Sequence, residues 1–366
     1  MAESERTDQR SRSIRNWLKL DCAQPLVLWA GQPAIRLGDE VILPNMNGIG
    51  ADYLTLPSLV QPIRAYRFDE LKYFSDGGSL YRTGKKFDYG NIVPSRSDLT
   101  TDEPSIDRIF DGERHGEVAS AFVLLHNPYP IYGHFLLEMA PKLLVYEYME
   151  RELPELQILL GWYTPKFILD WIEMLRPGAP KIFLKRAKHT VVRQSYYCDM
   201  LLDRYLLGDA FFEFIRMVKN RVSCDTESPR SEKIFISRIN RRNTSRDFRT
   251  WENEGEICSA LASEGFTVVQ PETLSIASQI RLFDKAKIVV GELSSALHNT
   301  IFCRPGTIVV QVNPFNAVQR RISLGLGHRL VSILPIGGEL SGWPPKDGKS
   351  SFKIDLSTIL SAIKSS

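Results

Sequence analysis

Apolar residues in the second half of the chain form short blocks that alternate with amphipathic stretches. Compact apolar runs predict strands at 233–237, 267–269, 287–290 and 307–312. Apolar positions at helical spacing predict helices over 252–264, 275–285 and 295–302. Because strand–helix–strand units of this length pack as parallel strands, they imply a parallel sheet that is covered on both faces.

The first half alternates less regularly but contains the same kinds of element. Strands are predicted at 119–125, 157–160 and 181–184, and helices at 132–150, 165–175 and 209–222. Residues 24–121 have short apolar runs among Gly, Pro and Asp, which is typical of short strands joined by long loops.

These patterns predict an α/β fold class with two Rossmann-like domains facing across a cleft. The expected division is a flexible tail at 1–15, an α/β domain at 16–205, a helix and linker at 206–230, and a second α/β domain at 231–366.

Composition and charge narrow the class of protein. The 366 residues are 43% hydrophobic and carry a net charge of +3. The chain as a whole therefore lacks the excess of positive charge that is typical of proteins that bind nucleic acids. Five dispersed cysteines, without a CxxC pair, fit a reducing compartment better than a disulfide framework. No apolar run approaches the roughly 20 residues that span a bilayer. We therefore expect a cytoplasmic protein, with peripheral attachment to an inner membrane left open.

The segment 289–302 carries the first functional signal. The predicted strand 287–290 is followed by Gly291 and then by the pair Ser294 and Ser295, which open a short helix. A helix start at the end of a strand offers backbone N–H groups and the positive end of a helix dipole to an anion. An ordinary strand-to-helix turn with a serine cap has the same pattern.

A basic loop, SRINRRNTSR at 237–246, follows the strand at 233–237 directly. Loops after the carboxyl ends of parallel strands are where ligands bind in open α/β sheets. Guanidinium groups bind phosphate oxygens bidentately and stay charged. Arg238, Arg241 and Arg242, together with the turn after Gly291, therefore predict one anion site. A solvated surface loop remains the alternative.

His134 and Glu138 are four residues apart in the predicted helix 132–150, so they share one helix face. Such a pair can act as a general base with its orienting carboxylate. It can equally be a buried histidine with its ion-pair partner. A metal site is disfavoured because no third ligand lies nearby.

Four segments in order resemble the glycosyltransferase family 61. YGHFLLEMAPKL at 132–143 is similar to the family's His–aromatic–Leu–Leu–acidic signature, and Ile236-Ser237-Arg238 to its Ile-Ser-Arg block. LSIASQIRLF at 274–283 and GELSSALHN at 291–299 resemble the two later blocks. The ordered set covers about residues 120–315.

The resemblance implies a metal-independent, inverting glycosyltransferase with the two-domain arrangement called GT-B. It implies a nucleotide-sugar co-substrate, UDP-linked by expectation, and no other cofactor. The domain at 231–366 would bind the donor and the domain at 16–205 the acceptor. The residues expected to contact the donor are Arg238, Arg241, Arg242, Glu292, Ser294, Ser295, His298 and Asn299.

His134 is the expected base and Glu138 the second choice. The acceptor would be a glycan or a lipid-linked sugar, in bacterial capsular or other surface polysaccharide synthesis. Leu293 stands where the family has His or Tyr, and Ser294 and Ala296 stand where it has glycines. These departures leave a second hypothesis open: a catalytically silent, sugar-nucleotide-binding or scaffold subunit of a polysaccharide assembly.

Overall fold

The computed structural model describes most of the chain and divides it into two compact units. The described residues are 3–20, 25–35, 37–43, 58–76, 79–82, 114–125, 131–186, 188–202, 205–222, 231–239, 249–337 and 350–364. The first unit contains residues 1–32, 60–204 and 209–214, and the second contains 33–59, 205–208 and 215–366.

The N-terminal segment is a helix rather than the flexible tail expected over 1–15. Helix α1 (Glu3–Leu18) is polar along most of its length, which is why its sequence resembled a tail. Its inner face buries Trp17, and Arg10 forms an ion pair with Glu213 at 2.6 Å. Tertiary contacts therefore stabilise a helix that its own pattern of residues does not reveal.

The first unit is built on a mixed, seven-stranded sheet. Its strands, in the order of their pairing, are β1 (Leu26–Trp29), β5 (Ile63–Asp76), β10 (His189–Cys198), β7 (Arg114–Val123), β8 (Gln157–Leu160) and β9 (Lys181–Phe183), with β6 (Ser79–Arg82) paired to β5. The four strands from β10 to β9 are parallel, whereas β5 pairs with β10 and β1 in antiparallel fashion. Within the parallel part, β7, β8 and β9 correspond to strands that the sequence predicted, whereas β10 was not predicted.

The single helix expected over 132–150 is divided into three parts. Helix α4 (Tyr132–His134) leads into a π-helix, η3 (Phe135–Met139), and then into α5 (Lys142–Glu150). Helices α6 (Lys166–Leu175) and α7 (Asp209–Val222) follow along the chain, and the residues of α7 are divided between the two units.

The second unit contains a fully parallel sheet of six strands. In order of pairing they are β13 (Thr267–Val269), β11 (Lys233–Ile236), β14 (Ile288–Glu292), β15 (Ile308–Val312), β16 (Arg329–Ile333) and β3 (Asp39–Leu43). Two short ladders pair β12 (Arg249–Trp251) with β17 (Ser350–Phe352) and β2 (Gln32–Pro33) with β4 (Leu59–Val60).

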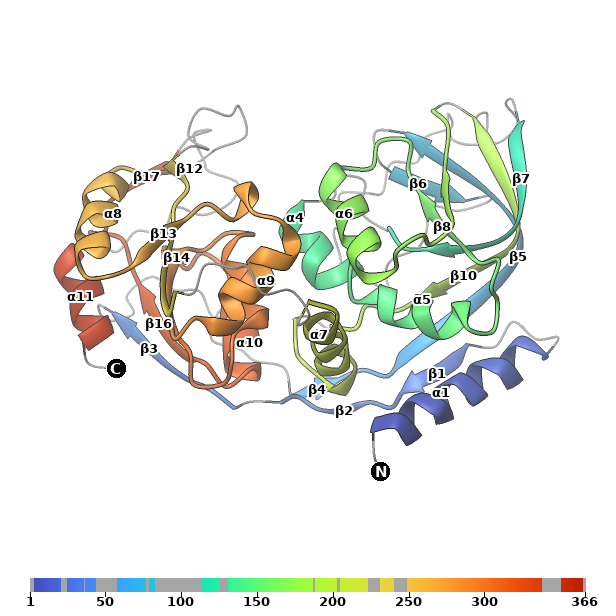
Figure 1. Ribbon diagram of the computed structural model, residues 1–366, viewed down its shortest axis with the longest axis horizontal. Helices are drawn as coiled ribbons and strands as arrows, with labels where there is room; N and C mark the ends of the chain where they lie inside the picture. Colours follow the sequence, from blue (N-terminus) through green and yellow to red (C-terminus); the bar gives the residue numbers. More distant parts are fainter. Residues whose placement is uncertain are drawn as a thin grey trace. The chain divides into compact units, whose positions relative to one another are not determined.

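The helices of the second unit cover both faces of this sheet. Helices α8 (Glu254–Ser263) and α11 (Leu356–Lys364) lie on one side, and α9 (Ile276–Lys285) and α10 (Val318–Gly325) lie on the other (Figure 1). The chain reverses its direction of travel across the sheet after β13, and right-handed crossovers then put α8 and α9 on opposite faces. The short helices η5 (Pro271–Thr273) and η6 (Leu297–Phe302) complete the unit.

The observed units differ from the predicted domains in the place of the edge strand β3. It belongs by sequence to the expected domain 16–205, but it pairs along its whole length with β16 of the second unit. Gly38 permits this approach, because a Cβ there would lie 2.2 Å from the carbonyl oxygen of His328. Each unit is therefore formed from separate stretches of the chain.

The mixed α/β class is confirmed, and the positions of the later elements match their predicted spans closely. Most boundaries differ by one or two residues, and one of these differences bears on Gly291: β14 continues through Gly291 to Glu292 instead of ending at residue 290. Gly291 pairs with Ile236 of β11, and a Cβ on it would lie 3.1 Å from the Cβ of Ile236. The glycine therefore serves close packing between strands rather than a break in the strand.

Candidate functional site

The His134–Glu138 pair forms as its spacing predicted. Nδ1 of His134 lies 2.6 Å from Oε1 of Glu138, and Glu138 is only 5% exposed. An ionised carboxylate can only accept a hydrogen bond, so Nδ1 carries the proton and Nε2 is the basic nitrogen. The histidine side chain is 28% exposed, which leaves part of the ring accessible to solvent.

Pro141 explains the π-helix that carries Glu138. A proline within an α-helix lacks an N–H group and its ring collides with the carbonyl group four residues earlier. Here the wider turn closes through a hydrogen bond from the N–H of Ala140 to the carbonyl oxygen of Phe135 at 2.7 Å. Such π-turns recur at functional sites because they re-aim side chains within a helix.

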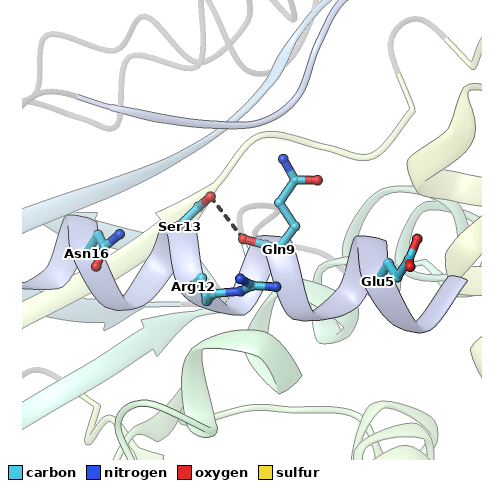
Figure 2. Close-up of a pocket in the computed structure, with 5 residues that line it drawn as sticks. All are labelled: Glu5, Gln9, Arg12, Ser13 and Asn16. Atoms are coloured by element: carbon cyan, nitrogen blue, oxygen red, sulfur yellow. Dashed lines mark hydrogen bonds between the residues drawn. The ribbon is translucent and has the colours of Figure 1, made fainter. Parts of the chain in front are cut away.

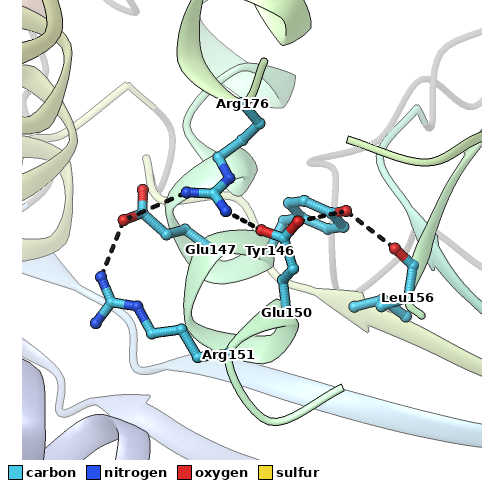
Figure 3. A network of polar contacts seen from close by, with 6 residues as sticks. All are labelled: Tyr146, Glu147, Glu150, Arg151, Leu156 and Arg176. Carbon is cyan, nitrogen blue, oxygen red and sulfur yellow. Dashed lines mark hydrogen bonds and ion pairs between the residues drawn. The ribbon is translucent and has the colours of Figure 1, made fainter. Parts of the chain in front are cut away.

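A buried polar network fixes α5 behind this turn. The guanidinium group of Arg176, at the end of α6, lies between Glu147 and Glu150 of α5 (Figure 3). The hydroxyl of Tyr146 donates to the carbonyl oxygen of Leu156 at 2.9 Å, just before β8. These contacts hold the helical segment that follows Glu138 against its neighbours.

The second predicted cluster lies where the strand order of the parallel sheet reverses. Taken in chain order, strands β11, β13, β14, β15 and β16 have the spatial order 2-1-3-4-5, so β11 and β14 are neighbours that lead in opposite directions. Ligands of doubly wound sheets bind outside the carboxyl ends of the strands at this switch point. Arg238 follows β11 and Glu292 ends β14, so both lie at the switch point.

Glu292 is the centre of the cluster. Its carboxylate is 3% exposed and accepts a hydrogen bond from Nη1 of Arg238 at 2.7 Å. Nε of Arg249 lies 3.4 Å from its other oxygen, and Arg249 also donates to the carbonyl oxygen of Leu293 at 3.2 Å. The guanidinium group of Arg249 stacks over the ring of Phe315 at 4.2 Å. One buried carboxylate thus orients two arginines.

A second carboxylate fixes the start of the loop after β11. Oε1 of Glu254 accepts from the hydroxyl of Ser237 at 2.9 Å and from the backbone N–H of Arg238 at 2.6 Å. Glu254 opens helix α8 and is 2% exposed. The main chain at Arg238 is therefore held from the side of α8 while its side chain is held by Glu292.

The turn after β14 contains the serines. The hydroxyl oxygen of Ser294 is buried and has no hydrogen-bond partner in the described structure, which makes it a candidate ligand contact. The side chain of Leu293 is 1% exposed, so it packs in the core instead of facing a ligand. The helix that follows, η6, is a 3-10 helix of six residues beginning at Leu297, whereas the sequence predicted a helix from Ser295.

His298 and Asn299 bond inside the second unit. Nδ1 of His298 lies 3.1 Å from the amide oxygen of Gln319, and Nδ2 of Asn299 donates to the amide oxygen of Gln279 at 3.1 Å. Asn299 is fully buried. These contacts tie η6 to α9 and α10, and contact of either residue with a ligand stays a prediction.

Two predicted residues, Arg241 and Arg242, lie outside the described residues. Two residues that sequence reasoning missed, Arg249 and Glu254, take part in the cluster around Glu292. A third, Lys142, is a fully buried lysine of α5. Lys142 had a local signal, because it lies four residues after Glu138 in the same apolar helix. Arg249 and Glu254 had none, because only the fold brings them to the switch point.

Other features of the described residues carry no comparable chemistry. No group of three or more His, Cys, Asp or Glu side chains within them is placed to hold a metal ion. None of the helices in the described ranges is long and apolar enough to cross a membrane. An open depression of about 650 Å³ follows one polar face of α1, lined by Glu5, Gln9, Arg12, Ser13 and Asn16 (Figure 2).

Comparison with known proteins agrees with the four sequence blocks. No curated protein matches the chain. The family model described as Glycosyltransferase 61 matches residues 132–310, a span that contains the His134–Glu138 pair and the cluster around Glu292. The match supports the assignment of this span, slightly less than half of the chain, to the glycosyltransferase 61 family.

Proposed function

We propose that the protein is an inverting, metal-independent glycosyltransferase. It moves a sugar from a nucleotide-sugar donor, UDP-linked by our hypothesis, to a hydroxyl group of a glycan or lipid-linked acceptor. The observation that carries the proposal is the 2.6 Å His134–Glu138 pair inside the segment that the glycosyltransferase 61 model matches. We further propose a bacterial, cytoplasmic role in surface polysaccharide synthesis, peripheral to the inner membrane.

The arginines at the switch point support the departure of the diphosphate in the proposed reaction. Negative charge develops on the departing diphosphate as the bond to the sugar breaks. Arg238 and the hydroxyl of Ser294 are suited to stabilise that charge, with Arg241 and Arg242 as further candidates. Because Glu292 fixes the guanidinium group of Arg238 before the donor binds, little reorganisation is needed as the charge grows.

Proton removal from the acceptor accompanies the departure of the diphosphate. With Nδ1 donating to Glu138, Nε2 of His134 is the nitrogen that accepts the proton of the acceptor hydroxyl. Glu138 stabilises the imidazolium ion that results. The hydroxyl oxygen attacks the anomeric carbon from the face opposite the diphosphate, which gives inversion in a single displacement.

A screen of nucleotide sugars tests the proposal. A donor at saturating concentration should raise the melting temperature by mass action, and the same donor should be hydrolysed or transferred to a supplied sugar acceptor. Absence of any thermal shift across UDP-, GDP-, TDP- and CMP-linked sugars would refute it.

A silent, sugar-nucleotide-binding subunit is the second candidate. It is favoured by the burial of Leu293 at a position where the family has His or Tyr, because a ligand contact is missing there. Such a subunit would bind UDP and show a thermal shift. It would neither hydrolyse nor transfer sugar from any bound donor, and that result separates the two candidates.

A further inference from the structure

Lys142 is a fully buried lysine next to the proposed base pair. Its side chain is 0% exposed, and Nζ lies 4.1 Å from the centre of the Tyr197 ring. Burying an ammonium group carries a large desolvation cost unless anions and an aromatic face compensate it. A buried ammonium group at such a position requires anions nearby that compensate its desolvation.

Lys142 continues the row of side chains that begins with His134. The residues His134, Glu138 and Lys142 follow one another at intervals of four, so each lies one helical turn after the last. Glu138 and Lys142 are both buried and lie one turn apart, so their opposite charges attract each other. Burial lowers the pKa of Lys142, and the charges of Cys198, Asp199 and, as the smallest of the three contributions, Glu138 raise it. Glu138 therefore has a proton donor on one side, His134, and a buried cation on the other.

The end of strand β10 supplies the other groups that face the ammonium ion. Burial raises the pKa of the Cys198 thiol to about 12, so this group is neutral at ordinary pH. Asp199 accepts from the backbone N–H of Arg64 at 2.9 Å and from the hydroxyl of Tyr66. Burial raises the pKa of Asp199, and its carboxyl group, like that of Glu138, contributes negative charge that raises the pKa of Lys142.

We propose that Lys142 is a positioning residue whose buried ammonium ion keeps Glu138 ionised and directed at Nδ1 of His134. The inference rests on the proposed function for its catalytic consequence. Without the cation, a carboxyl group as buried as Glu138 gains stability by taking up a proton. A protonated Glu138 no longer requires Nδ1 to be the protonated nitrogen, so the tautomer with a basic Nε2 is lost.

The proposal has a defined pH dependence. Burial is the largest cause of a pKa of about 8 for Lys142, opposed by the charges around it. Lysine is therefore positively charged below about pH 8 and becomes neutral above it. Turnover should fall on the alkaline side as the ammonium ion loses its proton, whereas an arginine at this position would remain charged.

The coupling between Lys142 and Glu138 can be measured without any enzymatic activity. Lysine labelled with ¹³C at Cε would be titrated by NMR, with the Lys142 signal assigned from the K142R variant. We expect a midpoint near pH 8 in the wild type and a midpoint lower by about 1 pH unit in E138Q. The inference would be overturned if the Lys142 signal titrates near the ordinary pKa of lysine. It would also be overturned if the E138Q substitution leaves the midpoint of the titration unchanged.

The catalytic consequence needs two variants and one control. K142M should lower kcat at least tenfold at pH 7 and leave the KM of the donor unchanged. It removes the cation from two buried carboxyl groups, which destabilises the fold, so kcat is compared at a temperature at which both proteins are folded. K142R should retain turnover and lose the alkaline decline near pH 8. Lys166→Met, at an exposed lysine of α6, should change neither quantity.

The outcomes separate this inference from the proposed function. If no donor is turned over, the proposed function fails, while the NMR titration still decides whether Lys142 and Glu138 are coupled. If turnover exists and K142M retains full kcat with an unchanged pH profile, Lys142 does not position the base pair and the inference is wrong.

Discussion

The two candidate clusters, one in each unit, are built in opposite ways. The row His134–Glu138 is local, because consecutive helical turns bring residues four apart into contact. The cluster around Glu292 is non-local, since Arg238 and Glu292 are 54 positions apart and meet only when β11 and β14 pair. The first cluster therefore depends on the geometry of one helix, and the second on the integrity of a sheet.

This difference predicts that changes in the first cluster affect chemistry and changes in the second affect stability. The largest expected effect is that of His134→Asn. Loss of a general base should lower turnover by about 10²- to 10⁴-fold while UDP affinity stays the same. Transfer assays and calorimetry measure the two quantities, with His115→Asn on β7 as the control. Unaltered turnover would exclude His134 as the base.

Glu292→Gln should instead destabilise the second unit. It leaves two arginines of low exposure without their anion, and the loss of one partner of a buried ion pair costs about 3 kcal/mol. Urea denaturation measures the change in the free energy of unfolding. Glu232→Gln breaks an exposed pair with Lys287 and should stay within about 0.5 kcal/mol of the wild type. Equal effects of the two substitutions would contradict the central role of Glu292.

Acid should weaken the second unit through His328. Burial lowers the pKa of this residue to about 4 from the ordinary value of 6.5. Between these values the unfolded chain binds a proton that the folded chain does not, so stability falls as pH decreases from about 6.5 to 4. The loss is on the order of 3 kcal/mol.

Urea denaturation at several pH values tests this dependence. His328→Leu removes the titrating group, so the variant should lose less stability than the wild type between pH 7 and pH 5. The same slope in both proteins would show that His328 does not contribute.

The smallest expected effect is that of Ser294→Ala. Because its buried hydroxyl has no partner in the described structure, the free energy of unfolding should change by less than about 0.5 kcal/mol. If the hydroxyl binds the diphosphate, UDP affinity should fall about tenfold. Ser259→Ala, on the exposed side of α8, serves as the control in calorimetry. Unchanged affinity would remove Ser294 from the donor site.

Local patterns predicted the elements well where one face of an element is apolar. Strands β8 and β13 match their predicted spans, and α9 begins one residue after its predicted start, with Ser275 as the cap. The helix α1 was missed, and the pairing of the short strand β3 with β16 was not predicted, because contacts distant in sequence decide both. A polar helix carries too little periodicity to be recognised by itself, and a short apolar run does not specify its partner strand.

In the two candidate clusters, too, local contacts could be predicted from the sequence and contacts between distant segments could not. The contact between His134 and Glu138 follows from helical spacing, and the positions of Arg238 and Glu292 after strands placed both at one edge of a sheet. Their direct ion pair, and the parts played by Arg249 and Glu254, could not be inferred, since side-chain pairing depends on which strands are neighbours.

The sequence by itself determined the alternation of strands and helices, the His134–Glu138 row and the family blocks, because each depends on residues close together in the chain. Tertiary structure decided that β11 and β14 flank the switch point, that Glu292 is buried beneath two arginines and that Leu293 faces the core. It also decided that Lys142 is a buried cation. These features depend on desolvation and on contacts between distant segments, and a linear pattern of residues does not specify either.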